Sequence, residues 1–316
     1  MKAVILDGYT TNPGDLSWDW LGALCDYEVY DRTPKELTLE RCKGCEIVIT
    51  NKTLLPRDIL ENLPELKYIG LLSTGYNVVD IDYCADKNIP VCNIPSYSTG
   101  AVAQLTFAFI LEHCSRVALH SQAVMNGEWS ACKDFCFQKA PLTELEGKTL
   151  GIIGYGKIGK TVARIAEAFG MNVCVYTSHP AGEGVSFVSL DELITQSDFI
   201  TVHTPLTPAT ENLVNSEFLS KMKKTAFLVN TSRGPVIDEK ALADALNNGQ
   251  IAGAGLDVLR SEPPEANNPL FNCKNCYITP HIAWAGFETR ERLMSVFKSN
   301  LEAFLAGKPQ NVVWKR

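Results

Sequence analysis

A glycine-rich turn at 154–159, Gly-Tyr-Gly-Lys-Ile-Gly, constrains the fold more than any other feature of the chain. An apolar, strand-like run at 150–153 precedes it, and apolar residues with helical spacing follow it. In that context Gly154 allows the tight turn, Gly156 lets a pyrophosphate approach the backbone, and Gly159 lets helix and strand pack closely. With 22 glycines in the chain the motif alone would be weak, but its flanks predict a dinucleotide site at a helix N-terminus.

Strand-like runs alternate with helical spacing along the whole chain, which predicts parallel sheets covered by helices. The expected strands lie at 3–6, 28–30, 47–50, 68–72 and 91–92, and then at 149–153, 173–176, 199–202, 226–229, 253–256 and 277–278. A long helix from 100 to about 119 separates the two series, and an amphipathic helix from 288 to 305 ends before Gly307. We predict an α/β fold with two doubly wound, Rossmann-like parallel-sheet domains, which the length of 316 residues allows.

Composition and charge argue against several classes of partner. The chain has a formal charge of -7, and its charged residues form no block of like sign. We therefore expect no nucleic-acid partner. The longest apolar stretch, 101–111, is shorter than the roughly 18 residues of a membrane span, and the first residues lack the pattern of a signal peptide, so we expect a cytoplasmic protein. Two Cys-x-x-Cys pairs, at 42–45 and 273–276, have the spacing of zinc ligands. Each adjoins an expected strand, so we predict reduced thiols, packed or on the surface, and no metal.

Three polar residues lie beyond strands of the second series, at the edge where open parallel sheets bind ligands. Arg233, Glu262 and His281 each follow one of the last three expected strands by a few residues. A cation binds a substrate carboxylate and polarises its carbonyl, a histidine gives a proton to the carbonyl oxygen, and a carboxylate stabilises the imidazolium. Taken one at a time, Arg233 also fits a loop salt bridge, Glu262 a solvated acid and His281 a packed core histidine. Together they predict the reduction of a 2-keto acid by hydride transfer.

Four segments resemble the signature blocks of the D-isomer-specific 2-hydroxyacid dehydrogenases. They are the turn at 154–159, Asn-Thr-Ser-Arg-Gly at 230–234, Asp-Val-Leu-Arg-Ser-Glu-Pro-Pro at 257–264 and Thr-Pro-His-Ile-Ala-Trp at 279–284. The resemblance covers nearly the whole chain, and the last block together with 7–18 is similar to the glycerate dehydrogenase, or hydroxypyruvate reductase, branch of the family.

The resemblance also implies a domain arrangement. The substrate-binding domain is expected to be discontinuous, formed by 1–97 and 287–316, and the dinucleotide-binding domain to span 98–286. The active site is expected in the cleft between them. A homodimer that pairs through the dinucleotide-binding domain is implied as well.

The resemblance implies a role for each candidate residue. His281 is the acid/base, Glu262 its partner and Arg233 the cation that binds the substrate carboxylate. The expected substrate contacts are Ser73, Thr74, Gly75, Arg233 and Trp284, of which Trp284 also fits simple packing. The expected dinucleotide contacts are Gly154, Gly156, Lys157, Ile158, Gly159, Thr177, Thr204, Pro205, Thr210, Thr231, Ser232, Arg233, Asp257 and His281.

The expected cofactor is NAD, but two positions depart from the commoner family pattern. Thr177 stands where an acid usually binds the ribose 2'-hydroxyl, although Glu183 or a backbone contact could replace that acid. The same loop also lacks an arginine for the extra phosphate of NADP, so the choice between NAD and NADP stays open. Gln104 stands where the long helix often carries glutamate.

The resemblance implies interconversion of hydroxypyruvate and D-glycerate, or of glyoxylate and glycolate. If Trp284 lines the pocket, it favours such compact substrates. Lactate-, phosphoglycerate-, formate- and phosphonate-type dehydrogenases are the alternatives within the family. A substrate with a phosphate group would need cations that the segment 71–77 lacks. From another class, an NADH-sensing transcriptional corepressor of the same fold is the alternative, although the sequence shows no long disordered tail.

Overall fold

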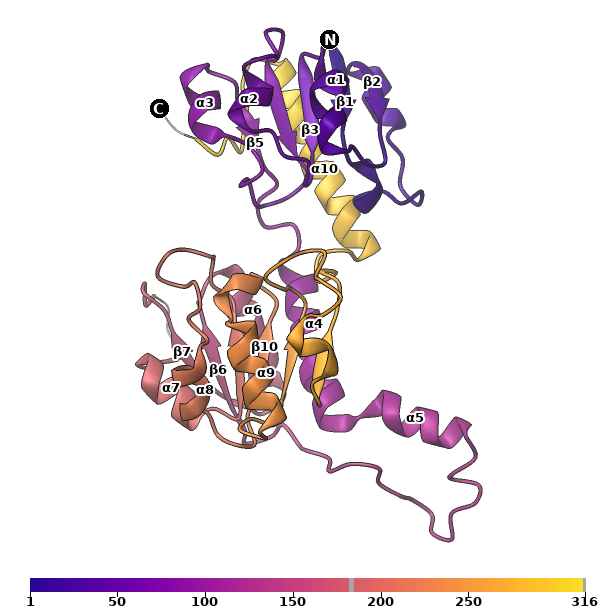
Figure 1. Ribbon diagram of the computed structural model, residues 1–316, viewed down its shortest axis with the longest axis vertical. Coiled ribbons are helices and arrows are strands. Elements are labelled where there is room, and N and C mark those ends of the chain that lie inside the picture. Colours follow the sequence, from indigo (N-terminus) through magenta and orange to yellow (C-terminus); the bar gives the residue numbers. More distant parts are fainter. Residues whose placement is uncertain (182–184, 315–316) are drawn as a thin grey trace. The chain divides into compact units, whose positions relative to one another are not determined.

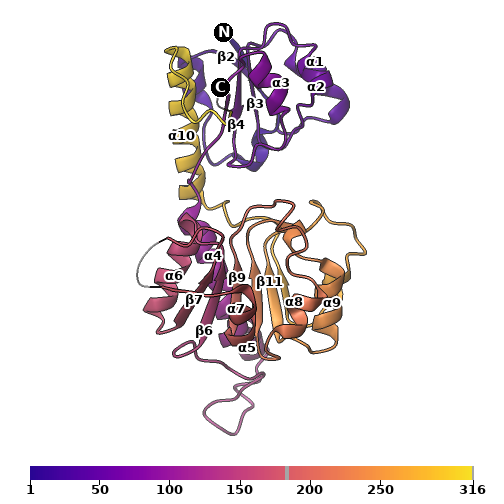
Figure 2. The same ribbon diagram turned by 90° about the vertical axis from the view of Figure 1, so that its left-hand side faces the viewer.

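The computed structural model describes residues 1–181 and 185–314, and the chain divides into two compact units. Unit 1 comprises Met1–Ser98 and Ala285–Arg316, and unit 2 comprises Thr99–Trp284. Each unit contains one parallel sheet with helices on its faces (Figures 1 and 2). The predicted fold class, α/β with two doubly wound parallel sheets, is confirmed.

The described part of unit 1 holds a five-stranded sheet in the order β2-β1-β3-β4-β5. The strands are β1 (Lys2–Ile5), β2 (Asp26–Val29), β3 (Ile47–Thr50), β4 (Tyr68–Leu71) and β5 (Val91–Cys92). The helices are α1 (Thr38–Cys42), α2 (Arg57–Leu60), α3 (Ile81–Asp86) and α10 (Phe287–Leu305), with 3-10 turns η1 (Gly8–Thr10), η2 (Asp19–Ala23) and η3 (Lys35–Leu37). The strands β3 and β4 are buried along their whole length, because continuous apolar runs suit a sheet covered on both faces.

The C-terminal helix α10 belongs to unit 1 and covers the face of the sheet opposite to α1–α3 (Figure 2). Its fully buried Phe297 packs against Gly70 of β4, and the ring of Phe304 stacks on Tyr68 with centroids 4.6 Å apart. Gly307 follows the helix with a φ of 74°, the left-handed conformation predicted for a residue that ends a helix. The last long helix therefore completes the domain that the first hundred residues begin.

The described part of unit 2 holds a seven-stranded sheet in the order β12-β11-β10-β9-β6-β7-β8. The strands are β6 (Thr149–Ile153), β7 (Asn172–Tyr176), β8 (Ser186–Phe187), β9 (Phe199–Val202), β10 (Phe227–Asn230), β11 (Gly253–Leu256) and β12 (Cys276–Ile278). The helices are α4 (Thr99–Ser115), α5 (Val117–Met125), α6 (Lys157–Ala168), α7 (Leu190–Gln196), α8 (Ser216–Lys221) and α9 (Glu239–Asn247), with 3-10 turns η4 (Gly234–Val236) and η5 (Pro269–Asn272). Sequence analysis missed β8, because its two residues, Ser186 and Phe187, do not form an apolar run.

Two apolar clusters hold the helices of unit 2 on the sheet. One cluster includes Phe107 of α4 and Val162 of α6, and the other includes Leu193 of α7, Phe218 of α8 and Leu242 of α9. The two groups of helices lie on opposite faces (Figure 2). The strand order reverses at β6, whose neighbours are β9 and β7, so the crevice at its carboxyl end is the place where such sheets bind ligands.

The prediction of a single helix from 100 to about 119 is wrong. The helix α4 ends at Ser115, Arg116 takes a left-handed conformation with φ 51° and ψ 42°, and α5 starts a new direction. The Arg116 guanidinium hydrogen-bonds the hydroxyl of Tyr277 and the side chain of Asn275. These partners are about 160 residues away in sequence, so nothing local marks the break. Among the described residues no single helix is long and apolar enough to cross a membrane, and only the bent pair α4 and α5 passes that test jointly, by length and composition.

A half-buried histidine makes the stability of unit 2 depend on pH. His113 of α4 stacks on Phe227 of β10 with centroids 4.2 Å apart, and burial lowers the pKa of His113 to about 4. Because this folded-state pKa lies below the ordinary 6.5, the unfolded chain binds the extra proton first, so stability is lost as pH falls from 6.5 toward 4. We expect His113→Phe, which keeps the stacked ring, to reduce the loss of unfolding free energy between pH 7 and pH 5 by about 2 kcal/mol in urea titrations. Equal losses in the two proteins would contradict this.

Candidate active site

The glycine turn lies at the carboxyl end of β6 and has the geometry of an anion-binding loop. Gly154 has a φ of 95°, and a Cβ there would lie 2.5 Å from the carbonyl oxygen of His203. A Cβ on Gly159 would lie 2.2 Å from the carbonyl oxygen of Gly154, whereas a Cβ on Gly156 would meet nothing within 4 Å. Close packing therefore excludes side chains at the first and third glycines, while the backbone at the second faces open space.

The residues around this turn fit a dinucleotide. The helix α6 starts at Lys157 with Gly156 as its N-cap. The first backbone N–H groups of the helix therefore have no helical carbonyl as acceptor, and they lie at the positive end of the helix dipole. Ile158 lies in the same first turn. Thr177 directly follows β7, and its hydroxyl accepts a hydrogen bond of 3.3 Å from the backbone N–H of His179. Glu183, the alternative ribose ligand, lies outside the described residues.

Other predicted dinucleotide contacts follow β9 and β10 on the same edge of the sheet. Thr204 and Pro205 begin the loop after β9, and the hydroxyl of Thr210 closes that loop by donating to the carbonyl of Pro205 at 2.7 Å. Thr231 is buried next to Thr106 of α4, with 3.3 Å between the two hydroxyl oxygens. The parallel strands therefore bring residues from three segments to one edge.

Asn230, the last residue of β10, shapes the loop that carries Arg233. Its side-chain oxygen accepts from the N–H and the hydroxyl of Ser232, at 2.9 and 2.8 Å, and its amide donates to the carbonyl of Arg233 at 2.9 Å. A Cβ on Gly234 would lie 2.0 Å from the carbonyl group of Leu259, so this loop packs directly on the loop after β11. The Arg233 side chain is exposed.

His281 and Glu262 form a close pair. The Nδ1 atom of His281 lies 2.6 Å from Oε2 of Glu262, and the other carboxylate oxygen accepts from the N–H of Leu259 at 3.2 Å. The two side chains are 27% and 35% exposed. A cavity of 420 Å³ borders both of them and is otherwise lined mainly by apolar residues that include Phe271 and Ile278. The geometry leaves Nε2 of His281 as the nitrogen that can face a substrate.

Asp257 holds the segment on which His281 lies. The carboxylate is 1% exposed and accepts from the hydroxyl of Thr279 at 2.6 Å and from the N–H groups of Ile282 and Ala283 at 2.8 and 2.9 Å. Its backbone carbonyl accepts from the N–H of His281 at 2.8 Å, and His281 has a left-handed φ of 54°. Burial raises the pKa of Asp257, although its three donors oppose that shift.

Sequence analysis assigned Asp257 only a dinucleotide contact and missed this positioning contact. Two of the three donors are backbone amides, 25 and 26 residues later in the chain. Backbone amides carry no residue signature, so the partnership has no pattern in the sequence. The contact with the dinucleotide stays a prediction.

The predicted substrate loop of unit 1 follows β4. The hydroxyl of Ser73 donates to the carbonyl of Gly75, and that of Thr74 donates to the carbonyl of Ile94, each at 2.7 Å. Backbone and hydroxyl groups were both expected to contact the substrate here, but these two hydroxyls donate to carbonyl groups of the protein itself. Among the described residues the backbone N–H groups of 73–77 have no acceptor, so the amides are the donors available to an anion. Trp284 is half-buried at the end of unit 2.

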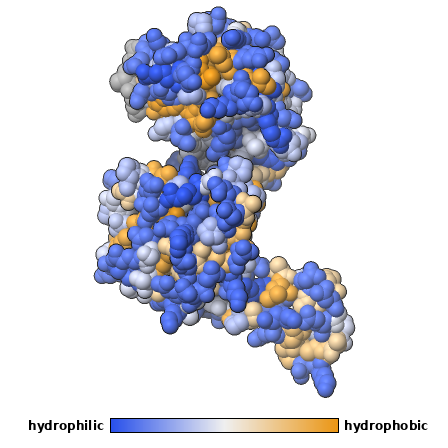
Figure 3. Space-filling model, viewed as in Figure 1, coloured by the Kyte–Doolittle hydropathy of each residue, from blue (hydrophilic) through white to orange (hydrophobic). Residues whose placement is uncertain are grey.

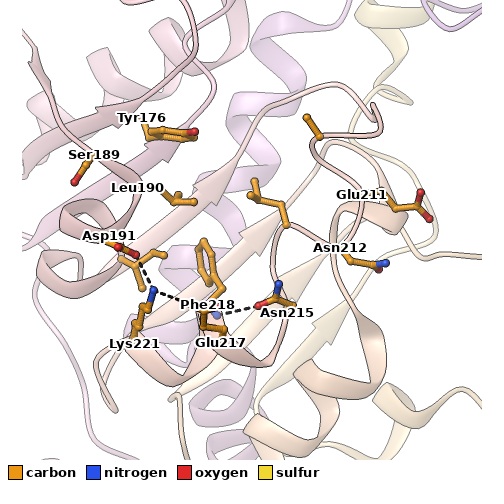
Figure 4. A pocket seen from close by; sticks show the side chains of 13 residues that line it. Tyr176, Ser189, Leu190, Asp191, Glu211, Asn212, Asn215, Glu217, Phe218 and Lys221 are labelled. Atoms are coloured by element: carbon orange, nitrogen blue, oxygen red, sulfur yellow. Dashed lines mark hydrogen bonds and ion pairs between the residues drawn. The ribbon is translucent and has the colours of Figure 1, made fainter.

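A second cavity, of 650 Å³, lies between the end of β7 and the helices α7 and α8 (Figure 4). Tyr176 lines it, and Lys221 bridges Asp191 and Glu217 at 2.9 and 2.8 Å across it. Glu211 adds a third carboxylate to the rim. None of the three catalytic candidates lines this cavity. It therefore lies near the loop of Thr177 and away from the His281–Glu262 pair.

All eleven cysteines are free thiols. Cys42 and Cys45 are buried, and burial raises the pKa of Cys42 and of Cys276 to about 12 in each case. Within the described ranges no group of three or more His, Cys, Asp or Glu residues is arranged to hold a metal ion. The Cys-x-x-Cys pairs thus lie in protein packing at strand entrances.

Comparison with known proteins gives one family. A family model described as "D-isomer specific 2-hydroxyacid dehydrogenase, NAD binding domain" matches residues 107–283. A hydroxypyruvate reductase of Blautia hydrogenotrophica is 50% identical over 322 residues, covering 100% of both chains. A glycerate dehydrogenase of Methylorubrum extorquens is 41% identical, covering 91% of this chain and 92% of the relative.

Solved structures agree with these relatives. An acyclic imino acid reductase in complex with NADPH and D-Arg has a TM-score of 0.87 and 34% identity, covering 99% of this chain and 100% of the other. A D-lactate dehydrogenase of Aquifex aeolicus, complexed with NAD and lactic acid, has a TM-score of 0.83 and 31% identity, covering 97% and 96%. The neighbours thus include complexes with either nicotinamide dinucleotide.

Proposed function

The chain belongs to the D-isomer-specific 2-hydroxyacid dehydrogenases, and on that premise we propose that it reduces hydroxypyruvate to D-glycerate, and glyoxylate to glycolate, with NADH. It is an oxidoreductase with an NAD-binding domain. The observation that carries the proposal is the His281–Glu262 pair, 2.6 Å apart, beside a loop that presents the exposed Arg233. The identity of 50% with a hydroxypyruvate reductase supports the choice of substrate.

Each polar group has its own task in the proposed reaction. The guanidinium of Arg233 binds the substrate carboxylate and polarises the adjacent carbonyl. When bound, the dinucleotide supplies the hydride that reduces C2. Protonated His281 gives its Nε2 proton to the carbonyl oxygen, while Glu262 stabilises the imidazolium through Nδ1. A 2-keto acid, one hydride and one proton thereby give a D-2-hydroxy acid.

We propose that NADH is used in preference to NADPH. The loop after β7 contains no arginine to bind an additional phosphate, and the cavity beside it has three carboxylates and one lysine at its rim. Negative charge near the adenosine end disfavours a 2'-phosphate through repulsion. The ratio of kcat/KM with NADH to that with NADPH measures this preference, and a ratio below one contradicts it.

Steady-state assays of the purified protein test the main proposal. Hydroxypyruvate, glyoxylate, pyruvate and phosphohydroxypyruvate are each offered with NADH and with NADPH, and coenzyme oxidation is followed by absorbance. We expect the largest kcat/KM for hydroxypyruvate with NADH. Consumption of neither coenzyme with any of the four would exclude the enzyme assignment and favour the corepressor alternative. A clear preference for pyruvate or phosphohydroxypyruvate would favour a lactate- or phosphoglycerate-type enzyme instead.

We also propose a homodimer that pairs through unit 2. Beyond α4, α5 and the loop up to about 145 extend away from the sheet of unit 2 (Figure 1), and apolar surface is visible on this arm (Figure 3). Met125 and Phe135 on the arm are 79% and 88% exposed, which is unusual for large apolar side chains in a surface without a partner. Light scattering should give the mass of two chains, and Phe135→Asp should shift it toward one.

We propose that the enzyme acts in the cytoplasm on small molecules, without nucleic-acid or membrane partners. Eleven free cysteines, most of them buried, suit a compartment that keeps thiols reduced. The net charge of -7 does not favour binding to phosphate backbones or anionic lipids. Cell fractionation would place the protein, and its appearance in a membrane pellet would contradict this.

A further inference from the structure

Two cysteines lie four positions apart on the arm of unit 2. Of the eleven cysteines, Cys136 is exposed and Cys132, Cys273 and Cys276 are half-buried, while the other seven are buried. The thiol of Cys132 donates to the carbonyl oxygen of Cys136 at 4.0 Å. The proposed reaction uses neither of these two residues. The arm therefore holds a close pair of thiols, one of which faces solvent.

Side-chain contacts close the loop that carries the two thiols. The indole N–H of Trp129 donates to the carbonyl of Phe135 at 3.0 Å, and Lys139 forms an ion pair with Glu128 at 2.6 Å. The segment 132–136 belongs to no helix or strand. Because one sulfur already contacts the backbone of the other cysteine, the two sulfur atoms can meet through side-chain rotation and a small adjustment of an irregular loop.

The two Cys-x-x-Cys pairs are less suited to oxidation than the pair on the arm. Cys42 and Cys45 are buried, and burial raises the pKa of Cys42 to about 12. The thiol of Cys273 donates to the carbonyl of Pro269 at 3.3 Å, and burial raises the pKa of Cys276 to about 12. The thiolate is the form that reacts, so burial and a raised pKa both slow its oxidation. A soluble oxidant therefore reaches the pair on the arm first.

We propose that Cys132 and Cys136 form a reversible disulfide within one chain by exchange with a low-molecular-weight disulfide such as oxidised glutathione. The thiolate of the exposed Cys136 attacks one sulfur of the oxidant, so that one glutathione thiolate leaves and a mixed disulfide forms. The thiolate of Cys132 then attacks the sulfur of Cys136 and releases the second glutathione thiolate. Two protein thiols are thereby oxidised, the disulfide of the oxidant is reduced, and the two protons of the protein thiols pass to the two glutathione thiolates.

The disulfide acts on the part of the arm that carries Phe135. This residue lies between the two cysteines in the sequence, and its side chain is 88% exposed. The new bond fixes the backbone on both sides of Phe135, so oxidation changes how the arm presents its apolar surface. Disulfides in the cytosol are typically transient and redox-sensing, and the proposed site is of that kind. The inference goes beyond the proposed function, because both thiols lie on the arm and take no part in hydride transfer.

Peptide mapping of the folded protein after oxidation tests the proposal. Lys133 lies between the two cysteines, so trypsin cuts between them, and the disulfide joins the peptides 117–133 and 134–139. After incubation with oxidised glutathione and blocking of the remaining thiols, we expect this joined pair in the wild-type digest and its loss on treatment with dithiothreitol. The joined pair should be absent in Cys132→Ser and in Cys136→Ser. A non-reducing gel of the oxidised wild type should show the mass of one chain.

Cys273 and Cys276 provide the matched control in the same digest, because Lys274 lies between them and trypsin separates them in the same way. We expect the joined fraction of the arm pair to exceed that of the control pair by at least about tenfold. Equal joining of the two pairs would overturn the assignment to the arm. A disulfide between two chains, a lasting glutathione adduct without closure, or arm thiols that react only after denaturation would each overturn it as well.

Discussion

Replacing His281 by alanine is expected to lower kcat for hydroxypyruvate reduction by about 10² to 10⁴-fold, the usual contribution of a positioned proton donor. The substitution removes the imidazole whose Nδ1 lies 2.6 Å from Glu262. Affinity for NADH should change little, because most of the proposed dinucleotide contacts lie at the glycine turn and in the loops after β7 and β9. Turnover from steady-state assays and coenzyme affinity from calorimetry check the two halves of this result separately.

Glu262→Gln and the double variant sharpen that prediction. Glutamine keeps the shape of Glu262 but removes the charge that stabilises the imidazolium, so kcat should fall by a smaller factor than in His281→Ala. Because the pair acts as a unit, the double variant should be no slower than His281→Ala alone. His113→Phe, which changes a histidine buried against Phe227, is the control and should keep the wild-type rate. A wild-type rate in His281→Ala would exclude proton transfer by that residue.

Removing the carboxylate of Asp257 is expected to affect both stability and turnover. Asp257→Ala leaves the hydroxyl of Thr279 and the amides of Ile282 and Ala283 without their buried acceptor, at a cost of about 3–5 kcal/mol in unfolding free energy. The residues before and after His281 lose their contacts with the Asp257 carboxylate. The left-handed backbone of His281 is then no longer held in place, so the imidazole moves relative to Glu262. We expect kcat to fall about 100-fold, because a displacement of about 1 Å has effects of that size.

Two milder variants separate positioning from general destabilisation. Asp257→Asn should lower the unfolding free energy by less, about 1–3 kcal/mol. The remaining side-chain oxygen still accepts hydrogen bonds, while the new NH₂ group faces an N–H group that it cannot accept from. Thr279→Val removes a single donor and should cost about 1 kcal/mol with little change in kcat. The chain has 5 histidines, so the ring nitrogens of His281 can be followed by NMR. An unchanged His281 Nδ1 signal in Asp257→Asn would contradict the positioning role.

The sheets were predictable from sequence because their strands are continuous apolar runs. The strands β3, β9 and β11 have the predicted bounds, and those of β1 and β10 differ by one residue at each end. Strands covered on both faces need apolar side chains at every position, which makes them visible without tertiary information. In contrast, β8 consists of one polar and one apolar residue, and Arg116 ends a helix where the sequence has no glycine or proline.

The candidate site was predictable in part, for a related reason. Parallel strands bring their carboxyl ends to one edge, so residues after different strands could be expected to meet there before their separations were known. The positions of Arg233, Glu262 and His281 after three consecutive strands followed from this rule. The rule says nothing about the loops beyond the strands. There Gly234 packs on Leu259 and Asp257 binds the segment that contains His281.

The sequence by itself determined the class of fold, the glycine turn after β6 and the identity of the polar groups at the carboxyl edge. Each of these depends on local physics: apolar periodicity, backbone freedom at Gly154, and the order of residues along one strand and its loop. Only the tertiary structure decided the 2.6 Å contact of His281 with Glu262 and the contacts of Asp257 with Thr279, Ile282 and Ala283. These contacts join residues that are 19 to 26 positions apart in the sequence, two of them through backbone amides, and their geometry is set by packing that no local pattern encodes.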